Sequence, residues 1–447
     1  METLSKKYGL ATAVAMVVGV VIGSGVFFKA DDVLILTNGN VLLALIAWGL
    51  GAFSMIFGAL CFAEFAGRIE RTNGVVDYLE TAYGERMGYL AGWFNCVLYF
   101  SILSAILSWV SALYTMILLG SDNPANSTMT WVLAVFYMVS IYTMNYVAPI
   151  LAGKFQVTTT AIKLIPLSLI AVLGFAFGIS NGVFVENMRV AASEMSRSGG
   201  TLASAVVATA FAYEGWIVAL TINSEIKDSK RNLPKALVMG TLLVFVVYVL
   251  YFLGITSMLP VDVILQQGDQ AVTMVATDLF GTVGGSILTV FVVISCLGTL
   301  NGLALTNSRI PYSLAVRNQG PAPKFFAKVD EKTNMPRHSA IGAFVLSIIY
   351  LAIWYGSLNN VFGRYIGLDE IPIVMIYGFY ILLYVWYMKN FTDLSGFNRY
   401  GKPICAILGA LVILYGGITN PNVGMYMIIS LIVLGSGLLF YRKEQTE

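Results

Sequence analysis

Charged residues are scarce in this 447-residue chain: Asp, Glu, Lys and Arg make up 11% of it, against about 25% in soluble globular proteins. Hydrophobic residues make up 58%, and the mean hydropathy is +0.79. A surface with so little charge would not keep a chain of this length dissolved in water. The net charge of +2 also gives no reason to expect a nucleic-acid partner.

Histidine and cysteine are almost absent as well. The single histidine, His338, excludes a metal site built from several histidines. The four cysteines, Cys61, Cys96, Cys296 and Cys405, lie far apart inside apolar runs and show neither zinc-ligand spacing nor a disulfide framework. No nucleophile, base or paired carboxylates form a convincing catalytic group. We therefore expect no metal, no cofactor and no enzyme activity.

Long apolar runs occupy most of the chain. A helix needs about 20 mostly apolar residues to cross a bilayer, whereas strands of a membrane barrel have about 10 residues of alternating polarity. The sequence predicts an all-α membrane protein, a single polytopic membrane domain over residues 1–447. Its twelve transmembrane helices are expected near residues 9–36, 41–66, 88–118, 130–149, 155–179, 201–226, 233–258, 283–307, 339–356, 371–388, 403–418 and 424–441.

The positions of lysine and arginine predict the orientation of these helices. An even number of spans puts both termini on one side, and basic residues gather in cytoplasmic loops. With a cytoplasmic N-terminus, 21 of the 26 basic residues lie in inside segments, four in outside loops and one, Lys163, within a span. We therefore expect a multi-pass protein of the cell membrane with its N- and C-termini in the cytoplasm.

Two of the predicted spans are interrupted. Gly23-Ser24-Gly25 breaks the first, and Tyr213-Glu214-Gly215 breaks the sixth. Close packing of helices through glycine is one explanation. Interrupted helices at matching positions in two halves are typical of transporters with inverted repeats. On this reading residues 8–179 and 200–389 form two five-helix repeats, and residues 401–441 add two C-terminal helices.

Broken helices in a membrane have a definite chemistry. Each break leaves free N–H groups at the start of one half-helix and free C=O groups at the end of the other. The N–H end carries partial positive charge and suits a carboxylate, whereas the C=O end suits an ammonium group. Two breaks facing each other would therefore suit an α-amino acid zwitterion.

Three ionisable residues within or near the spans need an explanation, since a charge at the bilayer centre costs at least about 2.5–3.5 kcal/mol. Lys163 either bonds backbone carbonyls structurally or serves as a fixed charge where related carriers bind sodium. Glu214 either caps the second half-helix, carries a proton or contacts substrate. Glu64 is expected to pair with Arg68 four residues on. Phe211, just before the second break, is either a gate or core packing.

Several motifs, taken in order, resemble the amino acid–polyamine–organocation superfamily and its L-amino-acid transporter branch. Small-substrate bacterial exchangers such as the alanine-serine-cysteine exchangers are the most similar. The motifs are Ile22-Gly23-Ser24-Gly25-Val26-Phe27, Ala63-Glu64 through Tyr78, Phe211-Ala212-Tyr213-Glu214-Gly215-Trp216 with Asn223 to Pro234, and Asn301, Ser308-Arg309 and Pro321 to Pro336.

The resemblance implies a five-plus-five inverted-repeat core with broken helices 1 and 6 and two additional helices. It also implies roles for individual residues. Phe211 would close the outer gate, and Lys163, with Thr299 as its neighbour, would replace the sodium ion of related carriers. The substrate carboxylate would bind backbone groups of Gly23, Ser24 and Gly25, and the amino group would bind carbonyls near Ile22, Phe211, Ala212 and Glu214.

The chain departs from this family pattern in three places. Glu70 and Val75 replace a usual proline and glycine, so the loop after the second span is expected to differ in shape. Glu214 occupies a position that is glycine in many animal relatives. The outside loop 120–128 lacks cysteine, so no disulfide-linked heavy subunit is expected.

The predicted function is sodium-independent exchange of small neutral L-amino acids by alternating access. Proton-coupled amino acid symport through Glu214 or Lys163 is the alternative within the same class. A membrane-embedded amino acid sensor is the alternative from another class.

Overall fold

The computed structural model describes residues 6–23, 25–71, 73–121, 123–125, 127–194, 202–268, 270–418 and 422–442, and the regular elements within them are helical. Eleven helices of this described part are long and apolar enough to cross a membrane. They are Val41–Arg68, Glu85–Leu118, Thr128–Val147, Pro149–Ser180, Leu202–Glu225, Ser229–Met258, Thr282–Ala315, Arg337–Leu358, Ile371–Asn390, Phe397–Ile418 and Val423–Phe440.

The first predicted span is absent from that set because its helix is split in two. Helix α1 covers Leu10–Val21 and α2 covers Gly25–Leu36. Each half has 12 residues and is therefore only about 18 Å long at 1.5 Å per residue, too short to cross a bilayer alone. Together the halves take the place of the predicted run 9–36, and the predicted all-helical membrane fold is confirmed.

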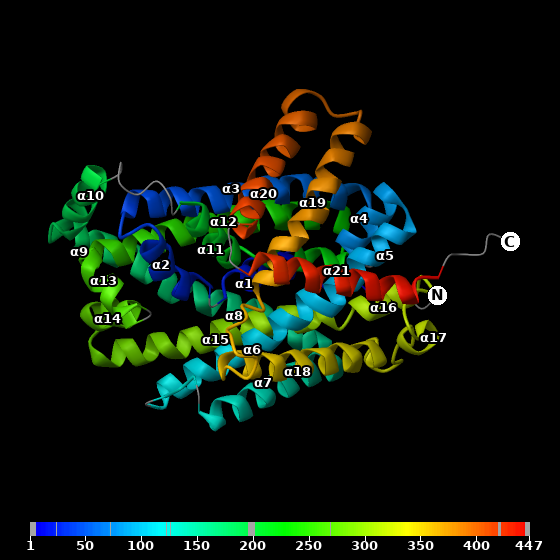
Figure 1. Ribbon diagram of the computed structural model, residues 1–447, viewed down its shortest axis with the longest axis horizontal. Coiled ribbons are helices and arrows are strands. Elements are labelled where there is room, and N and C mark those ends of the chain that lie inside the picture. The colour runs from blue at the N-terminus through cyan, green and yellow to red at the C-terminus, as the bar shows by residue number, and fades with distance from the viewer. Residues whose placement is uncertain are drawn as a thin grey trace.

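Within several spans the helix type changes, so the labels of Figure 1 divide them further. The sixth span begins as α11 (Leu202–Ala212), turns at residues 213–215 and continues as the 3₁₀ segment Trp216–Glu225. The remaining spans contain α3 (Val41–Arg68), α5 and α6 (Glu85–Phe94, Phe100–Leu118), α7 (Thr128–Val147), α8 and α9 (Pro149–Leu169, Phe175–Ser180), α12 (Ser229–Met258), α15 and α16 (Thr282–Asn307, Ile310–Ala315), α18 (Arg337–Leu358), α19 (Glu370–Asn390), α20 (Lys402–Ile418) and α21 (Val423–Phe440).

Short helices in the connections were not predicted from the sequence. They are α4 (Gly74–Tyr83), α10 (Val183–Glu194), α13 (Val261–Gln267), α14 (Gln270–Phe280) and α17 (Pro323–Phe326). All are too short to span a bilayer, which is why a search for long apolar runs passes over them. In Figure 1, α10, α13 and α14 lie at one end of the bundle, and the two chain ends lie at the other.

Hydrogen bonds also place both chain ends on one side of the bundle. The backbone N–H of Arg442 donates to the Gln319 side chain at 2.8 Å, and the Lys7 ammonium donates to the Asn334 carbonyl at 3.1 Å. Gln319 and Asn334 both lie in the connection between α15 and α18. We call this the terminal side of the molecule. Chain ends on one side agree with an even number of crossings.

Small residues allow the backbones of the fifth and seventh spans to come into direct contact. A β-carbon added at Gly174 would lie 2.7 Å from the carbonyl oxygen of Gly254. One added at Gly254 would lie 3.0 Å from Cα of Ala171, across a π-helical turn at Ile170–Gly174. Van der Waals packing of this kind drives helix association in lipid, where no hydrophobic force acts between apolar helices.

We predict that Gly254→Ala lowers the thermal unfolding midpoint of the detergent-purified protein, because the new methyl group overpacks this contact at a cost of about 1–3 kcal/mol. Gly378→Ala is the matched control, since a β-carbon there meets nothing within 4 Å. A midpoint for Gly254→Ala equal to that of the control would contradict the close packing.

Candidate functional site

The two helix breaks lie in direct contact. α1 ends at Val21, Ile22 leaves the helix with ψ of 80°, and α2 begins at Gly25. A β-carbon added at Gly25 would lie 2.9 Å from Cα of Ala212, the last residue of α11. The sequence analysis has the two interruptions facing each other, and the structure brings them together. Ser24, between the two half-helices, is outside the described residues.

The second break is a tight turn that needs glycine. Gly215 has φ of 101°, a backbone conformation that residues other than glycine rarely adopt. A β-carbon at Gly215 would also lie 2.7 Å from the Val20 side chain of α1. Gly215 thus permits both the turn and the close approach of the two broken spans.

A small cavity of about 40 Å³ lies at this junction. Of the residues predicted from the sequence, it is lined by Gly23, Gly25, Phe211, Ala212, Glu214 and Thr299. Its remaining lining residues are mostly apolar: Val20, Val21, Leu103, Leu107, Gly215, Leu303 and Ile373. Apart from Gly215, which belongs to the predicted second break, the sequence analysis missed these residues. The spacing of Leu103 and Leu107, four residues apart on one face of α6, is the one signal that could have indicated them.

Lys163 lies behind the cavity and is fully buried in α8. Its ammonium donates to the carbonyls of Gly19 at 2.7 Å, Ile22 at 2.5 Å and Ser295 at 3.1 Å. A lysine has three hydrogens to donate, so all three have acceptors. The last carbonyls of α1 also carry partial negative charge, which stabilises a cation there. Lys163 therefore ties the first break to α8 and α15.

Hydroxyl groups of α15 complete this cluster. Thr299 donates to the Gly19 carbonyl at 3.2 Å, the same oxygen that Lys163 uses. Ser295, which the sequence analysis missed, donates to the Ile22 carbonyl at 3.2 Å. Lys163 and Thr299 thus donate to one carbonyl oxygen of α1.

Tyr248 of α12 joins the two breaks directly. Its hydroxyl donates to the Val21 carbonyl at 2.7 Å and to the Ala212 carbonyl at 3.0 Å, and its one hydrogen is shared between them. These are the last residues of α1 and α11. Tyr248 is fully buried. Nothing in the local sequence sets Tyr248 apart from the other aromatic residues of its apolar run, so only the three-dimensional arrangement identifies it.

Glu214 reaches away from the turn toward two tyrosines. Tyr99 donates a short hydrogen bond to its carboxylate, and Tyr377 lies within 3.5 Å of the other oxygen. Both tyrosines are buried. The carboxylate lines the cavity and is held by hydroxyl groups of the third and tenth spans.

Phe211 is half-buried at the cavity. The ammonium of Lys29, on α2, lies 5.4 Å from the centre of the Phe211 ring, within range of a cation–π interaction. Lys29 also pairs with Asp32 at 2.6 Å. Away from the cavity, Glu64 pairs with Arg68 at 2.6 Å, which confirms the predicted i, i+4 contact.

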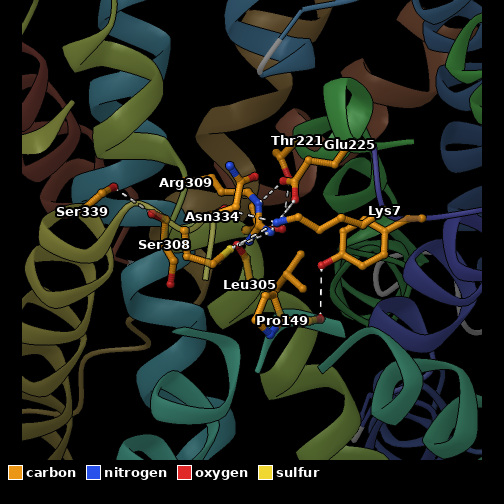
Figure 2. Close-up of polar contacts among 12 residues, drawn as sticks. Lys7, Pro149, Thr221, Glu225, Leu305, Ser308, Arg309, Asn334 and Ser339 are labelled. Carbon is orange, nitrogen blue, oxygen red and sulfur yellow. Dashed lines mark hydrogen bonds and ion pairs between the residues drawn. The ribbon is translucent and has the colours of Figure 1, made fainter. Parts of the chain in front are cut away.

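A second polar cluster closes the terminal side of the junction, and Figure 2 shows its members converging. Arg309, just after α15, forms a bidentate ion pair with Glu225, and the two side chains are 2% and 0% exposed. Lys7 lies 3.5 Å from the same carboxylate. Ten residues of α15 separate Thr299 at the cavity from Arg309, a rise of about 15 Å.

The N-terminal segment seals this cluster through its backbone. The N–H groups of Lys7 and Tyr8 donate to the Glu225 carbonyl at 2.8 and 3.0 Å, and the N–H of Lys227 donates to the Tyr8 carbonyl at 2.8 Å. The Tyr8 hydroxyl reaches the Pro149 carbonyl at 3.4 Å. Tyr8 and Ile226 therefore form an isolated parallel β-bridge, which holds the N-terminal segment against the end of the sixth span. We call Lys7, Tyr8, Glu225 and Arg309 the terminal-side cluster.

Comparison with known proteins matches residues 8–438 to a family described as Amino acid permease. The chain is 32% identical to the serine/threonine exchanger SteT of Bacillus subtilis (strain 168) over 381 residues, which are 85% of this chain and 82% of the relative. It is 27% identical to the b(0,+)-type amino acid transporter 1 of Mus musculus over 98% of this chain and 88% of the relative. Similarity to the Asc-type amino acid transporter 1 of Mus musculus reaches 31% over 74% of this chain and 62% of the relative.

We predict that Glu225→Gln destabilises the protein by about 3–5 kcal/mol, since it leaves the buried Arg309 charge without its partner. Thermal unfolding in detergent measures the loss. The double variant Glu225→Met with Arg309→Met should recover most of it, because an apolar pair of similar size avoids the buried charge. A single variant as stable as wild type would show that the ion pair does not hold this end closed.

Proposed function

The chain belongs to the amino acid permease family, and from this premise we propose that it exchanges small neutral L-amino acids across the cell membrane without sodium. Its relatives are amino acid transporters, which makes it a multi-pass membrane protein of amino acid transport. The observation that carries the finer proposal is the cavity at two broken helices, with the Lys163 ammonium bound to the carbonyls behind it.

The two breaks supply groups for both charges of an amino acid. The N–H groups that open α2, starting at Gly25, lie at a positive helix end and would bind the carboxylate. The Phe211 and Ala212 carbonyls each accept one donor in the structure, from the Glu214 N–H and from Tyr248. A carbonyl oxygen has two lone pairs, so each keeps one for the substrate ammonium.

The carbonyl of Ile22 differs from these two. It already accepts from Lys163 at 2.5 Å and from Ser295 at 3.2 Å, which uses both of its lone pairs. In our proposal Ile22 therefore shapes the site by holding Lys163. The substrate ammonium would bind Phe211 and Ala212 and lie near the Glu214 carboxylate.

Sodium independence is proposed from the position of Lys163. The carbonyls of Gly19, Ile22 and Ser295 and the hydroxyl of Thr299 form an oxygen cluster of the kind a hard cation prefers. The lysine ammonium already fills this cluster. A sodium ion at the same place would be repelled by the lysine charge, so we expect transport not to require sodium.

The proposed preference for small side chains rests on the walls of the cavity. Leu103, Leu107, Leu303 and Ile373 bring bulky apolar groups to the junction. The cavity's volume of about 40 Å³ is far below the about 300–1,000 Å³ of ordinary ligand pockets, so these walls leave little room for a substrate side chain. The name of the serine/threonine exchanger supports the same substrate class.

The sequence supports a proposed orientation of the carrier and a carrier without a heavy subunit. Both termini are proposed to be cytoplasmic because 21 of the 26 basic residues then lie inside. The terminal-side cluster would accordingly be the cytoplasmic gate, and Phe211 the outer gate. A disulfide-linked heavy subunit is not proposed, since loop 120–128 has no cysteine.

Proton-coupled symport remains the second candidate because of one specific observation. Glu214 is buried at the cavity, and tyrosine hydroxyls contact both of its oxygens. A carboxylate in such a place could take up a proton together with the substrate. A membrane-embedded sensor would use the same cavity to bind an amino acid but would not carry it across.

Exchange predicts an obligatory internal substrate. We expect proteoliposomes loaded with unlabelled serine to take up labelled serine, and empty vesicles to take up at most about a tenth as much. Replacing sodium by potassium should leave the rate unchanged. Accumulation into empty vesicles driven by an inward proton gradient, and lost in Glu214→Gln, would establish symport instead; binding without uptake in any vesicle would indicate a sensor.

Lys163→Ala tests the cation site. Removing the ammonium takes one donor from each of three buried carbonyls, and a lost hydrogen bond to a buried group costs about 1–3 kcal/mol. We expect serine counterflow to fall at least about tenfold while the protein stays monodisperse in gel filtration. Lys154→Ala is the control, an exposed lysine of the same helix. Normal counterflow by Lys163→Ala would exclude the lysine from the mechanism.

A further inference from the structure

A second hollow of the molecule lies on its lipid-facing surface, away from the helix breaks. It is a crevice of about 320 Å³ between α7 and α18, which lie side by side in Figure 1. Its lining comes from one face of each helix: Val139, Tyr142, Thr143 and Tyr146 of α7, and Arg337, Ala340, Ile341 and Phe344 of α18. We call it the α7–α18 crevice.

The walls of the crevice are apolar and face the membrane. Val139 is 43% exposed and Ile341 is 51% exposed, and both lie within membrane-spanning helices. Tyr142 and Phe344 form the inner part, with their rings in an edge contact at 5.6 Å. The Tyr142 hydroxyl is turned inward to Ser347 at 3.0 Å, so its ring alone faces the crevice. Such walls suit an acyl chain.

One end of the crevice is charged. Arg337 is the first residue of α18 and therefore stands on the terminal side, where the other basic residues of the 308–337 connection gather. Its guanidinium lies 5.9 Å from the centre of the Tyr146 ring. In the described part of the chain no carboxylate comes within ion-pair distance of Arg337. The guanidinium thus keeps its donors for a ligand.

The neighbouring acid, Asp330, does not take that role. One of its oxygens accepts from the N–H groups of Lys332 and Thr333 at 3.0 Å, and the other accepts from the Tyr146 hydroxyl at 3.0 Å. Its carboxylate is therefore committed to its own turn and to Tyr146. Asp330 holds the ring of Tyr146 at the mouth of the crevice, beside the guanidinium.

The dimensions match a membrane lipid. Along α18, Arg337 and Phe344 are seven residues apart, a rise of about 10 Å from the charged end into the hydrocarbon. A guanidinium at the headgroup level above an apolar channel of this depth is complementary to a phosphate with its acyl chain below. Basic pockets between membrane helices are known to select anionic headgroups. A packing helix of another protein would need a longer apolar face and would leave Arg337 unpaired.

We propose that the α7–α18 crevice binds one anionic phospholipid, with its phosphate on Arg337 and an acyl chain along Val139, Tyr142, Ile341 and Phe344. This site is separate from the amino acid site and does not depend on the proposed transport function. The bound lipid would fill the groove between the fourth and ninth spans.

Native mass spectrometry of the full-length, delipidated protein tests the site with two probes, dioleoyl-phosphatidylglycerol and dioleoyl-phosphatidylcholine. We expect one phosphatidylglycerol to bind wild type more tightly than phosphatidylcholine. Arg337→Gln should weaken phosphatidylglycerol binding at least about fivefold, as expected for one basic residue at a membrane surface, and should remove the preference. Lys328→Gln, which removes an exposed positive charge of the same connection, should change neither affinity.

A second variant tests the acyl channel. Ile341→Trp should fill the crevice and reduce the occupancy of both lipids, with its thermal unfolding midpoint checked to show that it is folded. An Arg337→Gln protein that keeps the wild-type preference for phosphatidylglycerol, or an equal loss in Lys328→Gln, would reduce the effect to general charge and overturn the proposal. So would unchanged lipid occupancy in folded Ile341→Trp, or co-purification of a stoichiometric protein partner at this face.

Discussion

Peptide groups inside a bilayer must find hydrogen-bond partners within the protein, and the two helix breaks concentrate that requirement at one junction. The partners come from three helices that are not broken there: Lys163 of α8, Tyr248 of α12 and Ser295 of α15. They bind the carbonyls that α1 and α11 leave open, among them those of Ile22 and Ala212. The breaks are thus stable because neighbouring helices replace the bonds that the helix itself would have made.

The charge of Lys163 is balanced in the same way. Within the described part of the chain no carboxylate forms an ion pair with it, and its acceptors are three carbonyl oxygens. Two of these, of Gly19 and Ile22, belong to the C-terminal end of α1, which carries the negative pole of the helix dipole. A helix that ended elsewhere would leave the ammonium without this compensation. The break and the lysine therefore depend on each other.

Much of this arrangement could be predicted from the sequence, because its causes are local. Apolar runs of span length and glycines at 23, 25 and 215 are visible one segment at a time, and Lys163 stands out as a charge inside an apolar run. The partners of these groups could not be predicted so directly. Tyr248 is one aromatic residue among many in its span, and its role depends on two carbonyls 36 and 227 positions away.

The terminal-side cluster escaped prediction for a related reason. Glu225 and Arg309 each stand at the end of a span, where a charged residue ordinarily meets the interface and needs no partner. Only the packing of the sixth and eighth spans brings them together and excludes water from both. The same holds for the cavity walls, since Leu103 and Ile373 come from spans far apart in the chain.

The two ends of the junction are held by very different interactions, and this asymmetry bears on how the carrier would work. On the terminal side, a buried bidentate ion pair and three backbone hydrogen bonds join residues 7–8 and Arg309 to the end of the 216–225 segment. At Phe211, the ammonium of the partly exposed Lys29 makes a cation–π contact with the ring. Opening the terminal side therefore breaks a buried ion pair, whereas the contact at Phe211 involves a lysine that is partly in solvent. A ligand shifts such an equilibrium only by its differential affinity for the two states. In the proposed exchange mechanism, the free energy to open the terminal side would come from a solute bound between the breaks, which an empty cavity cannot supply.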